Sequence, residues 1–279
     1  MNIKPDCYAC IYNQTLNLTK RLNLDDKKAS EILKEVGVIL SKYDLNITPP
    51  EIAKEVYELI SKKTGIFDPF KKEKEISIKE ALNLKKLLNP KTLLDAIKIA
   101  VAGNVIDLGV NQSYDIEKEI ENEIKFSINH YDYLEKKVIS SKTLCYIGDN
   151  AGENVFDEIL IKKIKEINPE LKIYYFTRGK PIINDITYED VKNLEIKNLA
   201  TIVDTKVPTP GFSLKYASKE SKEIFYNSDL VISKGMGNFE VLFNECNREV
   251  FYLFKVKCDV VANATKTKKG DFVILRGNK

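Results

Sequence analysis

Two side chains that can bind a hard metal ion stand directly after an apolar run of the sequence. Asp149 and Asn150 follow the stretch TLCYI (143–147) and precede a segment with helical periodicity. Carboxylate and carboxamide oxygens suit Mg²⁺ or Mn²⁺, and Asp185, beyond the next apolar run, can supply a third ligand. Such an ion leaves positions open for water and substrate, as metal-assisted hydrolysis requires. The alternative is that Asp149 or Asn150 caps the helix beginning near Gly152.

A glycine-rich stretch after a second apolar run predicts a phosphate-binding loop. KGMGNFE (234–240) follows DLVIS (229–233) and opens a helix, so its backbone N–H groups and the helix N-terminus can hold an anion. The expected phosphate contacts are Lys234, Gly235, Gly237 and Asn238. The GxG pair also begins a dinucleotide fingerprint, but Glu240 occupies the third glycine position. A tight turn with a solvent-facing lysine is the remaining interpretation.

A third pattern is the CYAC segment near the N-terminus. The spacing of Cys7 and Cys10 suits metal binding or redox chemistry, but no second CxxC follows and His130 is the only histidine. A zinc site would have to recruit a distant cysteine, and two ordinary thiols on an early helix are the simpler interpretation. The lone histidine also disfavours a Ser-His-Asp mechanism, and no GxSxG motif is present.

The elements that must position these residues change character near residue 140. Before it, apolar residues recur at helical spacing, as in 29–43, 50–63 and 92–107. From Lys142 onward, short apolar or β-branched runs alternate with helix-like segments, which predicts a mostly parallel sheet with covering helices. We expect a helical N-terminal region over 1–140 and an α/β core over 141–279. Ligands of such sheets bind beyond the carboxyl ends of the strands, where the polar stretches of the core lie.

Composition and charge exclude several classes of protein. The 279 residues are 43% hydrophobic, which is ample for a buried core, and 44 basic against 41 acidic residues give a net charge of +3. No basic tract marks a nucleic-acid partner, and no apolar run approaches the roughly 18 residues of a membrane span. The N-terminus lacks the features of a secretory signal, so we expect a cytoplasmic protein without a disulfide framework.

Seven motifs run in order along almost the whole chain: CYAC, TGIFDPFKKEK (64–74), AGNVIDLG (102–109), GDNAGE (148–153), RGKPIINDITYEDV (178–191), SKGMGNFE (233–240) and FKVKCDVVA (254–262). Together they resemble the damage-control phosphatase family, also known as domain of unknown function 89, and within it the subfamily with an N-terminal CxxC. One residue departs from the family pattern: Phe70 stands where tyrosine is expected after Asp68 and Pro69.

The resemblance implies a helical N-terminal region joined to a Rossmann-like three-layer α/β/α core. It further implies a divalent-metal phosphatase that acts on small phosphorylated metabolites, including nucleotides and sugar phosphates. Mn²⁺, Ni²⁺, Co²⁺ and Mg²⁺ are the candidate ions, and the resemblance assigns them to Asp149, Asn150 and Asp185.

A mechanism follows from combining the motifs with this resemblance. Lys234 and the backbone of 235–238 would neutralise charge on the transferring phosphoryl group, and Arg178 is a further phosphate contact. Glu153 or Asp185 would accept the proton of the attacking water. Asn104 and Asp107 share a helix face and would line the site, although a simple helix end at Gly109 explains them equally well. The rival functions are a nucleotide- or dinucleotide-binding oxidoreductase and a noncatalytic metabolite-binding module.

Overall fold

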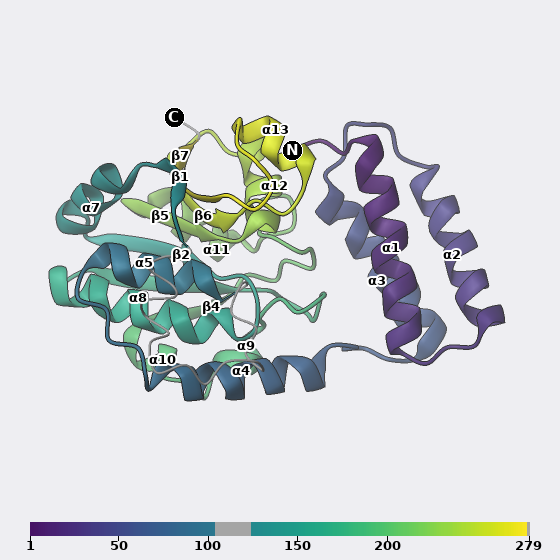
Figure 1. Ribbon diagram of the computed structural model, residues 1–279, viewed down its shortest axis with the longest axis horizontal. Coiled ribbons are helices and arrows are strands. Elements are labelled where there is room, and N and C mark those ends of the chain that lie inside the picture. Colours follow the sequence, from purple (N-terminus) through teal and green to yellow (C-terminus); the bar gives the residue numbers. More distant parts are fainter. Residues whose placement is uncertain (104–123, 278–279) are drawn as a thin grey trace.

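A three-helix bundle stands beside an α/β core in the computed structural model, which describes residues 1–103 and 124–277 (Figure 1). The helices are α1 (Pro5–Arg21), α2 (Asp26–Leu40), α3 (Pro49–Thr64), α4 (Lys71–Lys85), α5 (Leu93–Ala102), α7 (Tyr131–Ser140), α8 (Glu153–Ile167), α9 (Tyr188–Val191), α10 (Ile196–Leu199), α11 (Lys219–Asn227), α12 (Met236–Glu245) and α13 (Asp259–Thr265). The strands are β1 (Phe126–Asn129), β2 (Thr143–Ile147), β3 (Lys172–Thr177), β4 (Thr201–Asp204), β5 (Leu230–Lys234), β6 (Val250–Lys255) and β7 (Phe272–Gly277).

The strands of the described residues form one sheet in the order β1-β7-β6-β5-β2-β3-β4. Neighbours from β4 to β6 are parallel, β7 runs antiparallel to β6, and β1 pairs parallel with β7. The prediction of a mostly parallel sheet is confirmed. The chain runs outward from β2 through β3 to β4, then returns to β5 and proceeds the other way. This reversal between β2 and β5 creates the crevice in which ligands of open α/β sheets bind.

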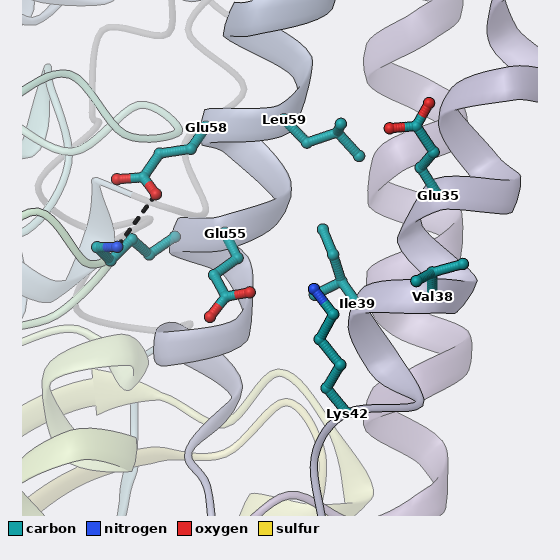
Figure 2. A pocket seen from close by; sticks show the side chains of 8 residues that line it. Glu35, Val38, Ile39, Lys42, Glu55, Glu58 and Leu59 are labelled. Carbon is teal, nitrogen blue, oxygen red and sulfur yellow. Dashed lines mark hydrogen bonds and ion pairs between the residues drawn. The ribbon is translucent and has the colours of Figure 1, made fainter.

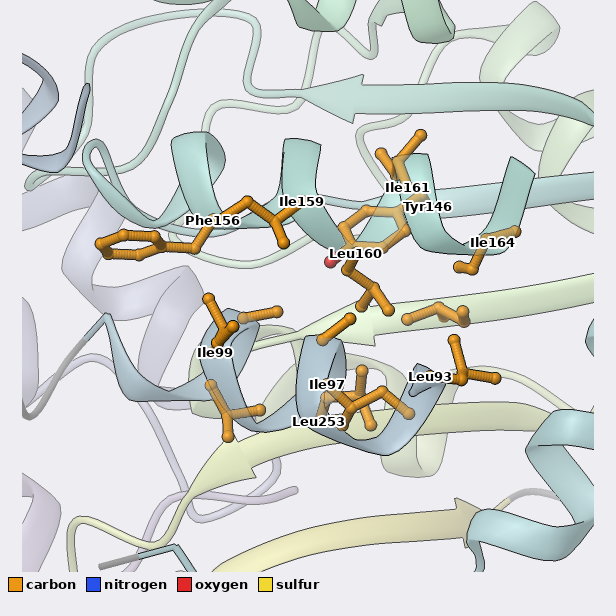
Figure 3. Packing of buried hydrophobic residues seen from close by; sticks show 14 of the residues in the cluster. Leu93, Ile97, Ile99, Tyr146, Phe156, Ile159, Leu160, Ile161, Ile164 and Leu253 are labelled. Atoms are coloured by element: carbon orange, nitrogen blue, oxygen red, sulfur yellow. The ribbon is translucent and has the colours of Figure 1, made fainter. Parts of the chain in front are cut away.

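Helices cover both faces of the sheet, so β5 is buried along its whole length and β2 is buried from Leu144 onward. Along β2, Leu144 and Tyr146 belong to one apolar cluster and Cys145 and Ile147 to the other, as the alternation of side chains in a strand requires. Helices α5 and α8 pack over the first face (Figure 3), while α11, α12 and α13 cover the second. The expected three-layer α/β/α arrangement is confirmed.

The bundle of α1, α2 and α3 has an apolar core of its own, to which Ile32, Val36 and Ile52 contribute. Helix α3 starts with a capping box between Thr48 and Glu51, and its C-cap is Gly65, which has the left-handed conformation with a φ of 73°. Ion pairs from α3 to the core, Glu51 with Lys215 and Glu58 with Lys180, connect the two parts.

Elements on the N-terminal side of residue 140 also belong to the sheet assembly. Strand β1 pairs with β7, and α4 and α5 pack against α8. The four residues of β1 were not predicted as a strand, because so short a run carries little periodicity. The division at residue 140 stays a prediction about folding units. In the described ranges, no helix is both long and apolar enough to cross a membrane.

Candidate functional site

The turn after β2 is hydrogen-bonded to the loop after β3. Ile186 N–H donates to the carbonyl of Asp149 at 2.9 Å, and Asn150 and Asp185 form an isolated antiparallel bridge. Gly148 permits this approach, since an added Cβ would lie 2.6 Å from Ile186 Cδ1. Two loops separated by a whole helix and strand therefore bring the three predicted metal ligands together.

Side chains of these two loops and of the first residue of α8 form a compact, mainly acidic group, here called the carboxylate cluster: Asp149, Asn150, Glu153 and Asp185. Asn150 Nδ2 donates to Asp149 Oδ2 and to Glu153 Oε1, both at 2.8 Å. The cluster is buried, with exposures from 3% for Glu153 to 9% for Asn150. The interpretation of Asp149 or Asn150 as a helix cap is wrong: the N-cap of α8 is Gly152, and no side chain caps it.

Arg178, at the end of β3, lies over the same cluster. Its Nε donates to Asp185 Oδ2 at 2.7 Å, and its Nη2 lies 3.9 Å from Asp149 Oδ1. Nη1 is buried and has no hydrogen-bond partner among the described residues. A buried donor left unpaired costs free energy, so an acceptor that reached Nη1 would be stabilised there.

The predicted phosphate loop packs closely against Asp149. Gly235 has φ 79° and ψ 159°, and a Cβ there would lie 1.9 Å from Asp149 Oδ2. Its N–H donates to Leu253 O at 3.0 Å and is already used. The side chain of Asn238 is also engaged, because Nδ2 donates to Gly148 O and Oδ1 accepts from Arg178 Nη2. Gly237 lies beside Gly211, with the added Cβ 3.7 Å from Gly211 N.

Lys234 is placed beneath the cluster rather than at its surface. The side chain is 1% exposed, and Nζ donates to Ala100 O at 2.5 Å and to Asp157 Oδ1 at 2.7 Å. Nζ also lies 3.6 Å from Glu153 Oε2. The interpretation of Lys234 as a solvent-facing lysine is wrong, and its predicted contact with phosphate stays a prediction.

Burial, followed by the crowding of acidic groups, governs the electrostatics of the cluster. Burial raises the pKa of Asp149 well above its usual value, and the charges of Glu153 and Asp185 raise it further, against opposing effects of Lys257 and Arg178. Burial also raises the pKa of Asp185, although the charge of Arg178 and the Gly211 N–H oppose this. Both carboxylates would thus be stabilised by additional positive charge.

Three contributors to the site were missed by the sequence reasoning. Lys257, after β6, is exposed, and its charge lowers the pKa of Asp149. The backbone N–H of Lys257 lies 3.4 Å from Met236 Sδ in the phosphate loop. Lys257 follows an apolar run directly, as Asp149 and Lys234 do, and this position could have predicted it as a site residue. Tyr57 of α3 carries a pKa raised by burial and also by the charge of Asp185. Asp157 had no sequence signal beyond its place one helical turn after Glu153.

The cysteines of CYAC lie on the first turns of α1. Cys7 is half-buried and accepts from Lys4 N–H at 3.4 Å, whereas Cys10 is exposed. Burial raises the pKa of Cys7, and charges on Glu240, Cys258 and Cys10 raise it further. Cys258, the N-cap of α13, is therefore the distant cysteine near this motif. Within the described chain, however, no group of three or more histidine, cysteine or acidic side chains is arranged to hold a metal ion.

Two cavities differ in their relation to these residues. One of about 750 Å³ adjoins Arg178 and is lined also by Phe67, Asp68, Tyr188 and Asp190. Another of about 420 Å³ lies between α2 and α3, where Lys42 and Glu55 face each other, and contains none of the predicted site residues (Figure 2). The predicted residues Asn104 and Asp107 lie outside the described part of the chain; α5 ends at Ala102, before them.

Comparison with known proteins agrees with this architecture. Residues 3–273 match the family model for the damage-control phosphatase ARMT1-like domain. A damage-control phosphatase of Pyrococcus horikoshii is 33% identical over 99% of this chain and 98% of its own. A damage-control phosphatase of Archaeoglobus fulgidus is 26% identical over 98% of both chains.

A solved structure extends the likeness to three dimensions. The crystal structure of a DUF89 family protein from Pyrococcus horikoshii superposes with a TM-score of 0.91, at 33% identity and over 100% of both chains. The predicted family and its assignment as a metabolite damage-control phosphatase are confirmed. With a family model spanning nearly its full length and relatives matched from end to end, the chain belongs to the damage-control phosphatase ARMT1-like domain family.

Proposed function

We propose that the protein hydrolyses phosphate monoesters of small metabolites, with nucleotides and sugar phosphates as candidate substrates, and that the reaction depends on a divalent metal ion. The observation that carries the metal dependence is uncompensated buried charge. Among the described residues, the buried carboxyl groups of Asp149, Glu153, Asp157 and Asp185 face two buried cations, Lys234 and Arg178, which leaves a formal charge of −2 when all four are ionised. Lys257 adds positive charge only from the exposed rim, and the raised pKa of Asp149 reflects the burial and crowding of these groups. Burying unpaired charge is costly, and one divalent cation balances this excess.

The chemistry of the donor set suits such an ion, although the described side chains form no group of three or more acidic, histidine or cysteine residues arranged around one. Asp149, Asn150 and Asp185 would hold it through two carboxylates and a carboxamide, hard oxygen ligands that suit Mn²⁺, Ni²⁺, Co²⁺ or Mg²⁺. When bound, the ion supplies electrophilic stabilisation of a phosphoryl oxygen and lowers the pKa of a water. Asn150 Nδ2 is occupied by two carboxylates, so its amide oxygen is the atom left for the ion.

The substrate phosphate would be held by cations and backbone. Arg178 Nη1, buried without a partner in the described structure, donates to a phosphoryl oxygen, and Lys257 attracts the ester from the exposed rim. The N–H groups beginning α12, at Gly237 and Asn238, add the favourable field of a helix N-terminus. Lys234 contributes charge from beneath, where it stabilises the cluster rather than approaching solvent.

The proton of the attacking water is assigned to Glu153. Asp185, the other candidate base, is committed to the ion and already accepts from Arg178 Nε and Gly211 N. Glu153 is directly linked to Asn150 and is not among the predicted ligands. As the water oxygen bonds to phosphorus, the bond from phosphorus to the metabolite oxygen breaks, and the metabolite leaves as an alcohol that takes a proton from solvent. The charge of the product phosphate is spread over oxygens that Arg178 would contact, so these residues act by positioning and electrostatics.

The proposal also covers the subfamily of the protein, its cellular location, its domain division and the space for the substrate. We assign the protein to the subfamily with an N-terminal CxxC, on Cys7 and Cys10, and to the cytoplasm. We retain 1–140 as the helical N-terminal region and 141–279 as the core with the metal and phosphate site, with β1, α4 and α5 as parts of the first region that pack on the sheet assembly. The cavity beside Arg178, about 750 Å³, offers room for the rest of the metabolite.

The test combines a substrate screen with matched variants. Phosphorylated metabolites are assayed for phosphate release with each of the four ions, before and after chelation. We expect chelation to abolish turnover and Asp149→Ala to lose metal affinity by calorimetry while staying folded. Asp132→Asn, an exposed aspartate on α7, is the control for removing a negative charge. Turnover that persists after complete chelation, or parental metal affinity in Asp149→Ala, would overturn the proposal.

A further inference from the structure

A network of buried polar side chains lies beneath the carboxylate cluster, and Asp157 of α8 is at its centre. Asp157 Oδ1 accepts from Tyr146 OH and Lys234 Nζ, both at 2.7 Å, and Oδ2 accepts from Tyr175 OH at 2.8 Å. None of these four side chains is more than 1% exposed. This buried network consists of Asp157, Tyr146, Tyr175 and Lys234.

Each donor to Asp157 comes from a different strand of the sheet centre. Tyr146 lies on β2, Tyr175 on β3 and Lys234 on β5, and these strands are adjacent. Tyr146 and Tyr175 are register partners whose rings stack with centroids 5.5 Å apart. Since these neighbouring strands lie at the centre of the sheet, the position of Asp157 is fixed by three elements at once.

The network continues upward through Lys234 to the cluster. Nζ lies 3.6 Å from Glu153 Oε2, and Glu153 and Asp157 share one face of α8, four residues apart. Glu153 Oε1 in turn accepts from Asn150 Nδ2, which also donates to Asp149 Oδ2. A continuous chain of contacts therefore joins the sheet centre to the amide of Asn150.

An amide nitrogen has two hydrogens, and both of those on Asn150 are directed at carboxylates. If Glu153 moved away, one hydrogen would lose its acceptor and the amide could rotate. We propose that Asp157 is a positioning residue: through Lys234 it holds Glu153 in place, and so keeps the amide oxygen of Asn150 turned toward the divalent ion. The inference rests on the proposed function, because it assumes that Asn150 is a ligand.

A role in stability alone does not account for this network. A buried ion pair such as Lys234 with Asp157 rarely adds net stability over apolar residues of similar volume, because both charges lose their hydration. Burial by itself would lower the pKa of Lys234, but Asp157 and Glu153 raise it, so the ammonium stays charged between two carboxylates. Support of metal ligands by hydrogen-bonded neighbours, in contrast, commonly decides metal affinity.

The experiment measures the affinity of the intact protein for Mn²⁺ by calorimetry, well below the unfolding temperature. Tyr175→Phe removes one hydrogen bond to Asp157 without changing charge, and Asp157→Asn weakens the contact with Lys234. Tyr252→Phe is the matched control, because Tyr252 is equally buried and its hydroxyl interacts with Cys246 instead. We expect a loss of about tenfold in affinity for Asp157→Asn and about threefold for Tyr175→Phe, and no loss for the control.

The outcomes separate this inference from the proposed function. If the parent protein binds no divalent ion, both are overturned. If the parent binds Mn²⁺ and Tyr175→Phe binds it as tightly, the positioning role alone is overturned, even when unfolding shows both tyrosine variants to be equally destabilised. A loss confined to Asp157→Asn would likewise refute it, because charge alone would explain that result. If Asp157→Asn does not fold, Tyr175→Phe decides the question.

Discussion

Replacing Gly235 by alanine tests how closely the phosphate loop must approach Asp149. The new Cβ would lie 1.9 Å from Asp149 Oδ2, whereas Cβ contacts below 3.0 Å are essentially not found in proteins. Either the carboxylate or the loop must therefore move by about 1 Å. A displacement of that size at a reacting centre costs on the order of 100-fold in rate.

The same substitution also strains the backbone, and the two effects must be separated. A φ of 79° with ψ of 159° is a conformation essentially restricted to glycine, so alanine there costs about 1–3 kcal/mol of stability. Gly270→Ala is the control: its φ is 99°, but no atom lies within 4 Å of the added Cβ. Both variants should lose stability, and only Gly235→Ala should lose turnover.

The assay follows phosphate release and Mn²⁺ affinity for parent, Gly235→Ala and Gly270→Ala, with urea unfolding on each. We expect about a 100-fold loss of kcat/KM and weaker Mn²⁺ binding in Gly235→Ala alone. If Gly235→Ala and Gly270→Ala keep equal activity and metal affinity, the close contact with Asp149 has no role in the site.

Two further predictions concern the region around Glu240 and CYAC. Burial raises the pKa of Glu240 to about 7 from 4.5, despite the opposing N-terminal amine and Lys257. Between these values the folded state binds more protons at Glu240 than the unfolded state does. This group should therefore lower the free energy of unfolding by about 2–3 kcal/mol as pH rises from 4.5 to 7. Glu240→Gln should reduce the pH dependence measured in urea titrations by that amount relative to the parent, and an unchanged pH dependence would contradict the prediction. The double variant Cys7→Ser, Cys10→Ser should keep its catalytic metal and its turnover, because thiolates are soft ligands and lie outside the oxygen site. Its stability or its redox sensitivity should change instead. Metal analysis and phosphate release measure the first two properties. Loss of the catalytic metal from the folded double variant would refute that separation.

Local sequence was sufficient to predict most strands and long helices. The run at 143–147 coincides with β2, and 201–204 with β4. These segments are predictable because their apolar or β-branched residues have the period and length of buried strands. The exception was β1, whose four residues pair with the distant β7. Its conformation depends on that partner more than on its own pattern.

The sequence alone also determined the family and the residues that come after the strands. Asp149, Asn150 and Asp185 could be grouped from sequence, because carboxyl ends of parallel strands meet at one edge of a sheet. Polar residue type and a preceding apolar run are both local properties, so no tertiary contact was needed to find them.

Only the tertiary structure decided what surrounds each of these side chains. Lys234 was expected near phosphate, yet its ammonium lies between Asp157 and Ala100 O, beneath the cluster. Lys257 instead occupies the exposed side. Which way a lysine at a strand end turns depends on the helices packed over each face, here α5 and α8, and on acceptors more than 70 residues away in sequence. The local sequence pattern does not predict such long-range packing, so only the three-dimensional structure shows it.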